Sequence, residues 1–142
     1  QAEDGIRDRS PSRGLGDVYK RQVQHQRLVG LINALDDARE HGVERTTLAL
    51  IVEELLRYTK LHFAFEEKLI KRYAVPRSEQ HRAEHRFLTA QVRNFSRDFA
   101  ERGVEITEEL MAFLRDWLTF HILKTDRSLV DALRAAGAVS AA

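Results

Sequence analysis

The stretch TTLALIVEELLRYTKLHFAFEEKLIKRY, residues 46–73, decides the fold of this chain. Its apolar residues recur at steps of three and four, which is the period of an amphipathic α-helix. His62 and Glu66 are in phase with these apolar residues, so the face that enters the core also carries two polar groups. Pro76 prevents the helix from continuing. The stretch predicts one long helix with a polar site on its buried face.

Three further segments have the same period. They are residues 18–41, 78–102 and 108–136, and each is followed directly by a glycine, a residue that commonly ends helices. The connections are short, so neighbouring helices should be antiparallel. No segment alternates as a strand would. The predicted fold is all-α, an up-down-up-down antiparallel four-helix bundle.

The first 22 residues differ from the rest of the chain. Residues 1–16 are rich in glycine, serine, proline and charge, which predicts a disordered or poorly packed arm. Residues 17–22, DVYKRQ, resemble the translated end of a transposon used to build sequencing libraries. We therefore expect a non-native or disordered segment at residues 1–22 and one folded domain at residues 23–142. A genuine flexible N-terminus is the alternative.

The composition narrows the class of protein. There is no cysteine, which excludes disulfides, thiolate zinc sites and cysteine-ligated iron–sulfur clusters, and fits a reducing compartment. The formal net charge is +1 and no basic stripe is visible, which argues against a nucleic-acid partner. No apolar run approaches the roughly 20 residues that cross a bilayer. These features favour a cytoplasmic protein without a membrane partner, and we expect a monomer.

Histidines and carboxylates recur in three short motifs and at one isolated position. The motifs are HFAFE at residues 62–66, HRAEH at residues 81–85 and HILKTD at residues 121–126, and the isolated histidine is His25. Residues four apart on a helix point the same way. The ends of the first motif can therefore reach one ion, or its carboxylate can bridge two, and both histidines of the second motif can bind one ion.

The last motif has a different spacing. His121 and Asp126 are five residues apart, about 140° on a regular helix. We favour a sideways reach of Asp126 between helices, and a π-bulge in the backbone is the alternative.

The ligand types indicate which ions fit. Five imidazoles and two carboxylates without sulfur suit iron or manganese better than structural zinc, which prefers four ligands. If both carboxylates bridge two ions, five histidines give three terminal ligands to one ion and two to the other. The second ion then keeps an open position for a small molecule.

These motifs, with His25, His62-x3-Glu66, His81-x3-His85 and His121-x4-Asp126, resemble those of the hemerythrins, especially the bacterial ones, over residues 23–142. Myohemerythrin, a member of that family, is a known up-down-up-down bundle, so the resemblance implies the same topology. It also implies two iron ions joined by an oxo or hydroxo bridge. The implied ligands are His81, His85 and His121 on one iron, His25 and His62 on the other, and Glu66 and Asp126 as bridges.

The resemblance also implies an oxygen pocket beside the iron with two histidines. The family lines this pocket with large apolar side chains, and the matching residues are Leu28, Phe63, Trp117, Leu118 and Ile122. Ordinary packing in a bundle core would equally explain their types.

Three polar residues near the motifs have simpler explanations. His41 directly precedes Gly42, where a helix C-terminus favours positive charge, so we expect it to cap the helix. Glu67 and Glu84 are predicted to be solvated, with a contact to an imidazole N–H of a metal ligand as the alternative.

The function implied by the resemblance is reversible dioxygen binding, as a carrier, store or delivery protein that is not an enzyme. Nitric oxide and small anions are further candidate ligands. Two alternatives remain: an oxygen, redox or nitric oxide sensing module, and a di-iron oxidase, peroxidase or iron-cluster repair factor. The Glu-x-x-His pairs of ferritin-like oxidases are absent, which argues against the enzyme branch.

Overall fold

The computed structural model describes the backbone of residues 11–121 and 126–135, and the side chains of residues 16–121 and 127–135. Within these ranges it contains five helices and no strand, which confirms the all-α prediction. The helices are α1 (Pro11–Glu40), α2 (Arg45–Arg72), α3 (Glu79–Arg102), α4 (Glu108–Phe120) and α5 (Asp126–Ala135).

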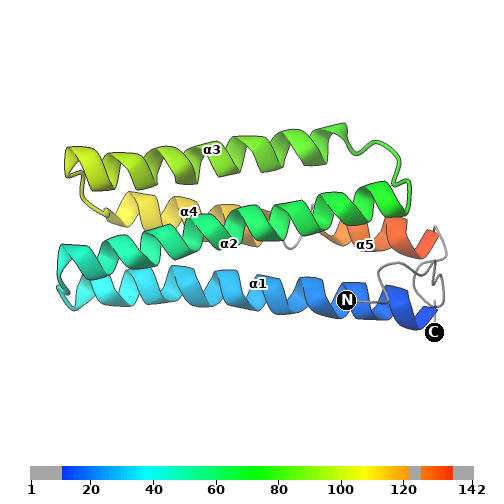
Figure 1. Ribbon diagram of the computed structural model, residues 1–142, viewed down its shortest axis with the longest axis horizontal. Helices are drawn as coiled ribbons and strands as arrows, with labels where there is room; N and C mark the ends of the chain where they lie inside the picture. Colours follow the sequence, from blue (N-terminus) through cyan, green and yellow to red (C-terminus); the bar gives the residue numbers. More distant parts are fainter. Residues whose placement is uncertain (1–10, 122–125, 136–142) are drawn as a thin grey trace.

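The helices pack as a bundle. α1 contacts α2 and α4, and α2 also contacts α3. Figure 1 shows all of them running along the long axis of the molecule, with the α1–α2, α2–α3 and α3–α4 connections at its ends. α5 joins the bundle through Leu129 and Leu133, which pack against Leu69 and Ile70 of α2. No described helix combines the length and the apolar character needed to span a membrane.

Local signals place the helix ends close to the predicted positions. Gly42 and Gly103 follow α1 and α3 with φ angles of 67° and 70°, a left-handed conformation that glycine adopts without strain. The side chain of Thr107 accepts a hydrogen bond from the backbone N–H of Leu110 at 3.1 Å, which caps α4.

The predicted disordered arm, residues 1–16, is wrong for residues 11–16, which belong to α1 together with the predicted helix that follows. Proline is compatible with the first turn of a helix, and α1 begins at Pro11. The side chain of Asp17 accepts hydrogen bonds from Arg72, the last residue of α2, and from Tyr73 directly after it, and Arg21 is only 4% exposed. Contacts with α2 therefore hold a segment whose composition alone predicts disorder. Residues 1–10 lie outside the described residues.

The predicted fourth helix, residues 108–136, is represented by two helices. α4 ends at Phe120 and α5 begins at Asp126, and residues 122–125 lie outside the described residues. The backbone takes a π-type turn at His121, directly after α4. The prediction of one regular α-helix running through His121 was therefore wrong.

The interior has three zones along the bundle. The larger apolar cluster comprises Leu28, Ile32, Leu35, Val52, Leu55, Phe63, Leu88, Val92, Phe99, Ile106, Met111, Leu114, Trp117 and Leu118. The smaller apolar cluster comprises Leu69, Ile70, Leu129 and Leu133. A set of polar side chains lies between the two apolar clusters along the helices, and we call it the histidine layer. It comprises His25, His62, Glu66, His81, His85 and His121.

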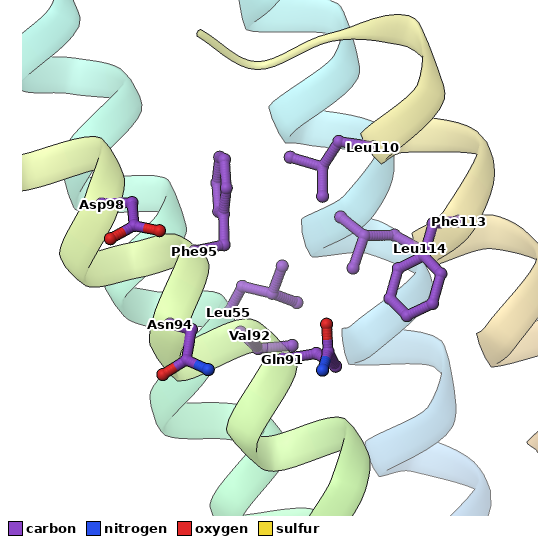
Figure 2. Close-up of a pocket in the computed structure, with 9 residues that line it drawn as sticks. All are labelled: Leu55, Gln91, Val92, Asn94, Phe95, Asp98, Leu110, Phe113 and Leu114. Atoms are coloured by element: carbon purple, nitrogen blue, oxygen red, sulfur yellow. The ribbon is translucent and has the colours of Figure 1, made fainter. Parts of the chain in front are cut away.

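A groove of about 320 Å³ opens between α3 and α4, far from these polar groups along the helices. Figure 2 shows Phe95 of α3 and Leu110 of α4 on opposite sides of it, with Leu55 of α2 also lining it. None of its lining residues is a predicted metal or oxygen-pocket residue. The groove is therefore a feature of the apolar end and not of the candidate site.

Candidate metal centre

Three helices and the end of a fourth supply the histidine layer. His25 comes from α1, His62 and Glu66 from α2, His81 and His85 from α3, and His121 directly follows α4. His62, Glu66 and His121 are 0% exposed, and the side chain of His81 is only 10% exposed. Burying this many polar side chains without compensation is costly. The arrangement therefore requires something that satisfies them together.

The five imidazoles divide into two sets around the single carboxylate of Glu66. On what we call the two-histidine side, the Nε2 atoms of His25 and His62 lie 3.7 and 3.2 Å from Glu66 Oε2. On the three-histidine side, the Nε2 atoms of three rings lie close to Oε1: His81 at 3.5 Å, His85 at 3.0 Å and His121 at 3.2 Å. Each oxygen thus faces its own group of nitrogens, as a bridging carboxylate would.

These distances fit metal coordination. Two ligands that each lie about 2.1 Å from an ion, at right angles to one another, are separated by about 3 Å. One group of ligand atoms comes from His25, His62, Glu66 and His121, and within it all atoms lie within 4.8 Å of one another. The second group comes from Glu66, His81, His85 and His121, under the same limit. The layer therefore fits a metal site with two adjacent positions.

The outer ring nitrogens show where the protons lie. Nδ1–H of His62 donates to the Oε1 atom of Gln24 at 2.9 Å, and Nδ1–H of His85 donates to Glu67 Oε2 at 2.9 Å. Nδ1–H of His121 donates to Glu84 Oε1 at 3.4 Å. The partners are oxygen acceptors, so these three bonds belong to the tautomer in which Nδ1 carries the proton. The Nε2 atom of His85 also lies at hydrogen-bond distance from Glu66 Oε1, 3.0 Å, a contact that either a second ring proton or a metal ion would satisfy.

The inward lone pairs demand a cation. Nε2 of His62 and of His81 are buried and have no hydrogen-bond partner among the described residues. In the tautomer of His62 that donates through Nδ1, the Nε2 lone pair faces Glu66 Oε2 at 3.2 Å, and the two repel each other unless a cation lies between them. This chemistry of the donor set shows that the residues fit a metal.

Protonating the imidazoles is the other way to supply positive charge, and burial opposes it. Burial lowers the pKa of His25 to about 4, against the smaller upward effects of the hydrogen bond and charge of Glu66. Burial also lowers the pKa of His62, where the neighbouring imidazoles add to the effect. Neutral rings near pH 7 are the form that binds metals.

Two predicted site residues lie beyond what the structure describes. Ile122 falls outside the described residues, and the side chain of Asp126, the first residue of α5, also does. The backbone of residues 122–125, which distinguishes a sideways reach from a π-bulge, also lies outside the described residues. The direction of the Asp126 carboxylate is not part of the described structure, so its role stays a prediction.

Apolar side chains surround the histidines as predicted. Leu28, Phe63, Trp117 and Leu118 are all buried in the larger apolar cluster. The ring of Phe63 stacks on His85, with centroids 3.9 Å apart and planes 9° apart. Trp117 stacks against His121 at 5.9 Å. These residues therefore form apolar walls beside the rings, although the structure does not by itself assign them to a gas pocket.

Sequence reasoning gave too little weight to the outer partners. Glu67 and Glu84 were predicted to be solvated, but each accepts a hydrogen bond from a histidine of the layer. Gln24 was given no role as a hydrogen-bond partner, although it is adjacent to His25 and only 6% exposed. His41 has the expected role, since its Nδ1 donates to the backbone oxygen of Asp37 at 2.8 Å near the end of α1.

Comparison with known proteins gives independent evidence. Residues 21–133 match the family model described as Hemerythrin HHE cation binding domain. The chain is 38% identical over 111 residues to Bacteriohemerythrin from Pseudomonas paraeruginosa, covering 78% of this chain and 71% of that protein. It is 30% identical over 112 residues to Bacteriohemerythrin from Stenotrophomonas maltophilia, covering 79% and 72%. It is 28% identical over 104 residues to Bacteriohemerythrin from Methylococcus capsulatus, covering 73% and 79%. No solved structure gives a significant match.

Proposed function

Because the chain belongs to the hemerythrin family, we propose that it binds dioxygen reversibly at a non-haem di-iron centre. One observation carries the proposal: five imidazole nitrogens divide two and three between the oxygens of one buried carboxylate. That division supports one ion with more protein ligands and one ion with fewer. The ion with fewer protein ligands keeps an open coordination position, where a small molecule can bind.

In this proposal each side of the layer holds one iron. His81, His85 and His121 bind the first, and His25 and His62 bind the second. Glu66 bridges the two, and Asp126 is proposed as a second bridge from the start of α5. The two helices α4 and α5 then act together as the fourth element of an up-down-up-down bundle, with the site where they meet.

The pair of irons would supply electrons to dioxygen when it binds and would take them back when it is released. The protein holds the rings in place and keeps water away. Gln24, Glu67 and Glu84 fix the Nδ1–H groups of three histidines, so their Nε2 lone pairs stay directed inward. Leu28, Phe63, Trp117 and Leu118 are buried and apolar, and a dry surrounding restricts the proton supply that would make binding irreversible.

We propose that no substrate is transformed. The described walls beside the rings are apolar and aromatic, and they offer no obvious acid that could donate a proton to a bound molecule. A carrier, store or delivery role for dioxygen fits this surrounding better than oxidase or peroxidase chemistry does.

The direct test is anaerobic reduction followed by exposure to air, with the visible spectrum and iron content recorded in parallel. We expect two irons per chain and a visible charge-transfer band that appears with oxygen and disappears when oxygen is removed. Immediate conversion to a stable oxidised spectrum, without a reversible stage, would contradict the proposal and favour redox sensing or oxidase chemistry.

A variant tests the ligand assignment. His62→Ala should lower the iron content or abolish oxygen binding while the protein stays largely helical by circular dichroism. His41→Ala is the matched control, because His41 is an exposed histidine outside the layer. Full iron content with retained oxygen binding in His62→Ala would refute the assignment.

A further inference from the structure

We infer that the two metal positions hold their ions with unequal strength, because two histidines of the three-histidine side donate to carboxylates and one histidine of the two-histidine side donates to an uncharged amide. The three-histidine side is expected to bind tightly and the two-histidine side to exchange its ion. Glu67 and Glu84 are the positioning residues for the tight side, and Gln24 is the neutral counterpart on the other. The inference rests on the proposed di-iron function.

The charge difference is visible in the partners of the outer nitrogens. On the three-histidine side, the Nδ1–H groups of His85 and His121 donate to the carboxylates of Glu67 and Glu84. On the two-histidine side, Nδ1–H of His62 donates to the uncharged amide oxygen of Gln24.

A carboxylate acting through an imidazole has a known effect. A negative charge at Nδ1–H raises the basicity of the opposite nitrogen, so the ring becomes a stronger ligand and stabilises a more positive ion. An amide oxygen orients the ring in the same way but adds no net charge. The two sides therefore receive similar orientation and different electron donation.

Burial determines how much of this charge reaches the rings. The side chain of Glu84 is 22% exposed and that of Glu67 is 37% exposed, so water screens both of them in part. Each contacts a ring that is at most 2% exposed, so the path through the imidazole itself is dry. The two carboxylates act on two rings of one ion, so their effects fall on the same position.

Ring packing reinforces the difference. His85 is stacked on Phe63, with planes 9° apart, and His121 is stacked on Trp117, with planes 28° apart. His62 contacts the same Phe63 ring at a tilt of 45° and is not stacked on it, and His25 and His62 meet edge to face at 4.6 Å, as His81 and His85 also do. A carboxylate and an aromatic ring thus fix each of two ligands on the three-histidine side, which lowers the cost of ordering them around an ion.

The number of histidines alone would also favour the three-histidine side, so the test must change the charge without changing the ligands. Iron-loaded protein is dialysed under argon against increasing concentrations of a ferrous chelator, and the iron retained per chain is measured. The wild type should release iron in two separate steps. His62→Ala should retain one iron that leaves at the second, tighter step.

The double variant Glu67→Gln with Glu84→Gln keeps the shape of both side chains and removes both charges. It should shift the tighter step to a chelator concentration about 10–100 times lower, and leave the weaker step in place. Glu53→Gln is the matched control, since it removes an exposed charge from the same helix as Glu67 without touching the layer. It should shift neither step.

Gln24→Glu is the converse change. Its expected result is tighter iron binding, which structural damage would not produce. The substitution places a charge behind His62 and should shift the weaker step about tenfold towards higher chelator concentration. A shift of the tighter step instead, or no shift in either charge variant, would overturn the inference.

The outcomes separate this inference from the function on which it rests. Two irons per chain that leave in a single step would refute unequal binding and leave the proposed function standing. Fewer than two irons per chain in the wild type would refute the proposed function itself.

Discussion

The larger apolar cluster and the histidine layer are built on the same helices, yet they are stabilised in opposite ways. The apolar cluster gains free energy from burial alone, at about 25 cal/mol per Å² of apolar surface removed from water. The histidine layer buries five imidazoles and one carboxylate, which costs free energy until a cation binds the inward lone pairs. The larger apolar cluster can therefore supply the folding free energy that the histidine layer lacks without a metal.

Metal removal should produce the largest effect, because it acts only on the layer. An ion that binds the folded state alone stabilises it by about 4 kcal/mol when its free concentration is 1,000 times Kd. We therefore expect the free energy of unfolding of the iron-free protein to fall by at least about this amount. Urea unfolding of loaded and chelator-treated protein measures the difference.

Hydrogen exchange of the same two samples tests where the effect lies. Amides of residues 59–66, around the layer, should lose protection on metal removal more than amides of residues 48–55, which pack in the apolar end of α2. Equal loss along α2 would mean that the two regions do not behave separately.

Much of this comparison was already predictable from the sequence. The steps of three and four in residues 46–73 placed α2 within one residue at each end, because burial of one face sets that period. His62 and Glu66 were assigned to the buried face by the same reasoning, and both are 0% exposed. Residue spacing within a helix is a local property, so the sequence reports it directly.

The features that the sequence did not reveal depend on contacts between helices. Glu67 and Glu84 meet histidines that are 18 and 37 residues away, and no local pattern indicates such a pair. The helicity of residues 11–17 was missed for the same reason, because the contacts of Asp17 with Arg72 and Tyr73, at the end of α2, span more than 50 residues.

A cavity in the apolar cluster should give the next largest effect. Leu35 is 0% exposed, and Leu35→Ala should lower the free energy of unfolding by about 2–5 kcal/mol. The loss should be similar in loaded and iron-free protein, and the iron content should stay at the wild-type value. Leu50→Ala is the matched control, because Leu50 is 67% exposed on α2 and should change stability little. Lost iron in Leu35→Ala would show that the apolar end also shapes the metal site.

The smallest of the three effects is expected from pH, and it tests the layer without metal. An ordinary histidine has a pKa near 6.5, and burial lowers the pKa of His25 to about 4. Between these values the unfolded chain binds more protons than the folded one, so stability decreases as the pH falls from about 6.5 to about 4. The shift corresponds to at most about 3 kcal/mol.

Urea unfolding of iron-free protein across this pH range measures the effect, and His25→Gln separates it from other titrations. The variant has no proton to gain at this position, so its stability should vary less with pH than that of the wild type. The lowered pKa of His62 remains in both proteins and gives a common slope of the same sign. Identical profiles would mean that His25 is not held in its neutral form by burial. At His25, the contrast between the histidine layer and the apolar cluster would then rest on the metal alone.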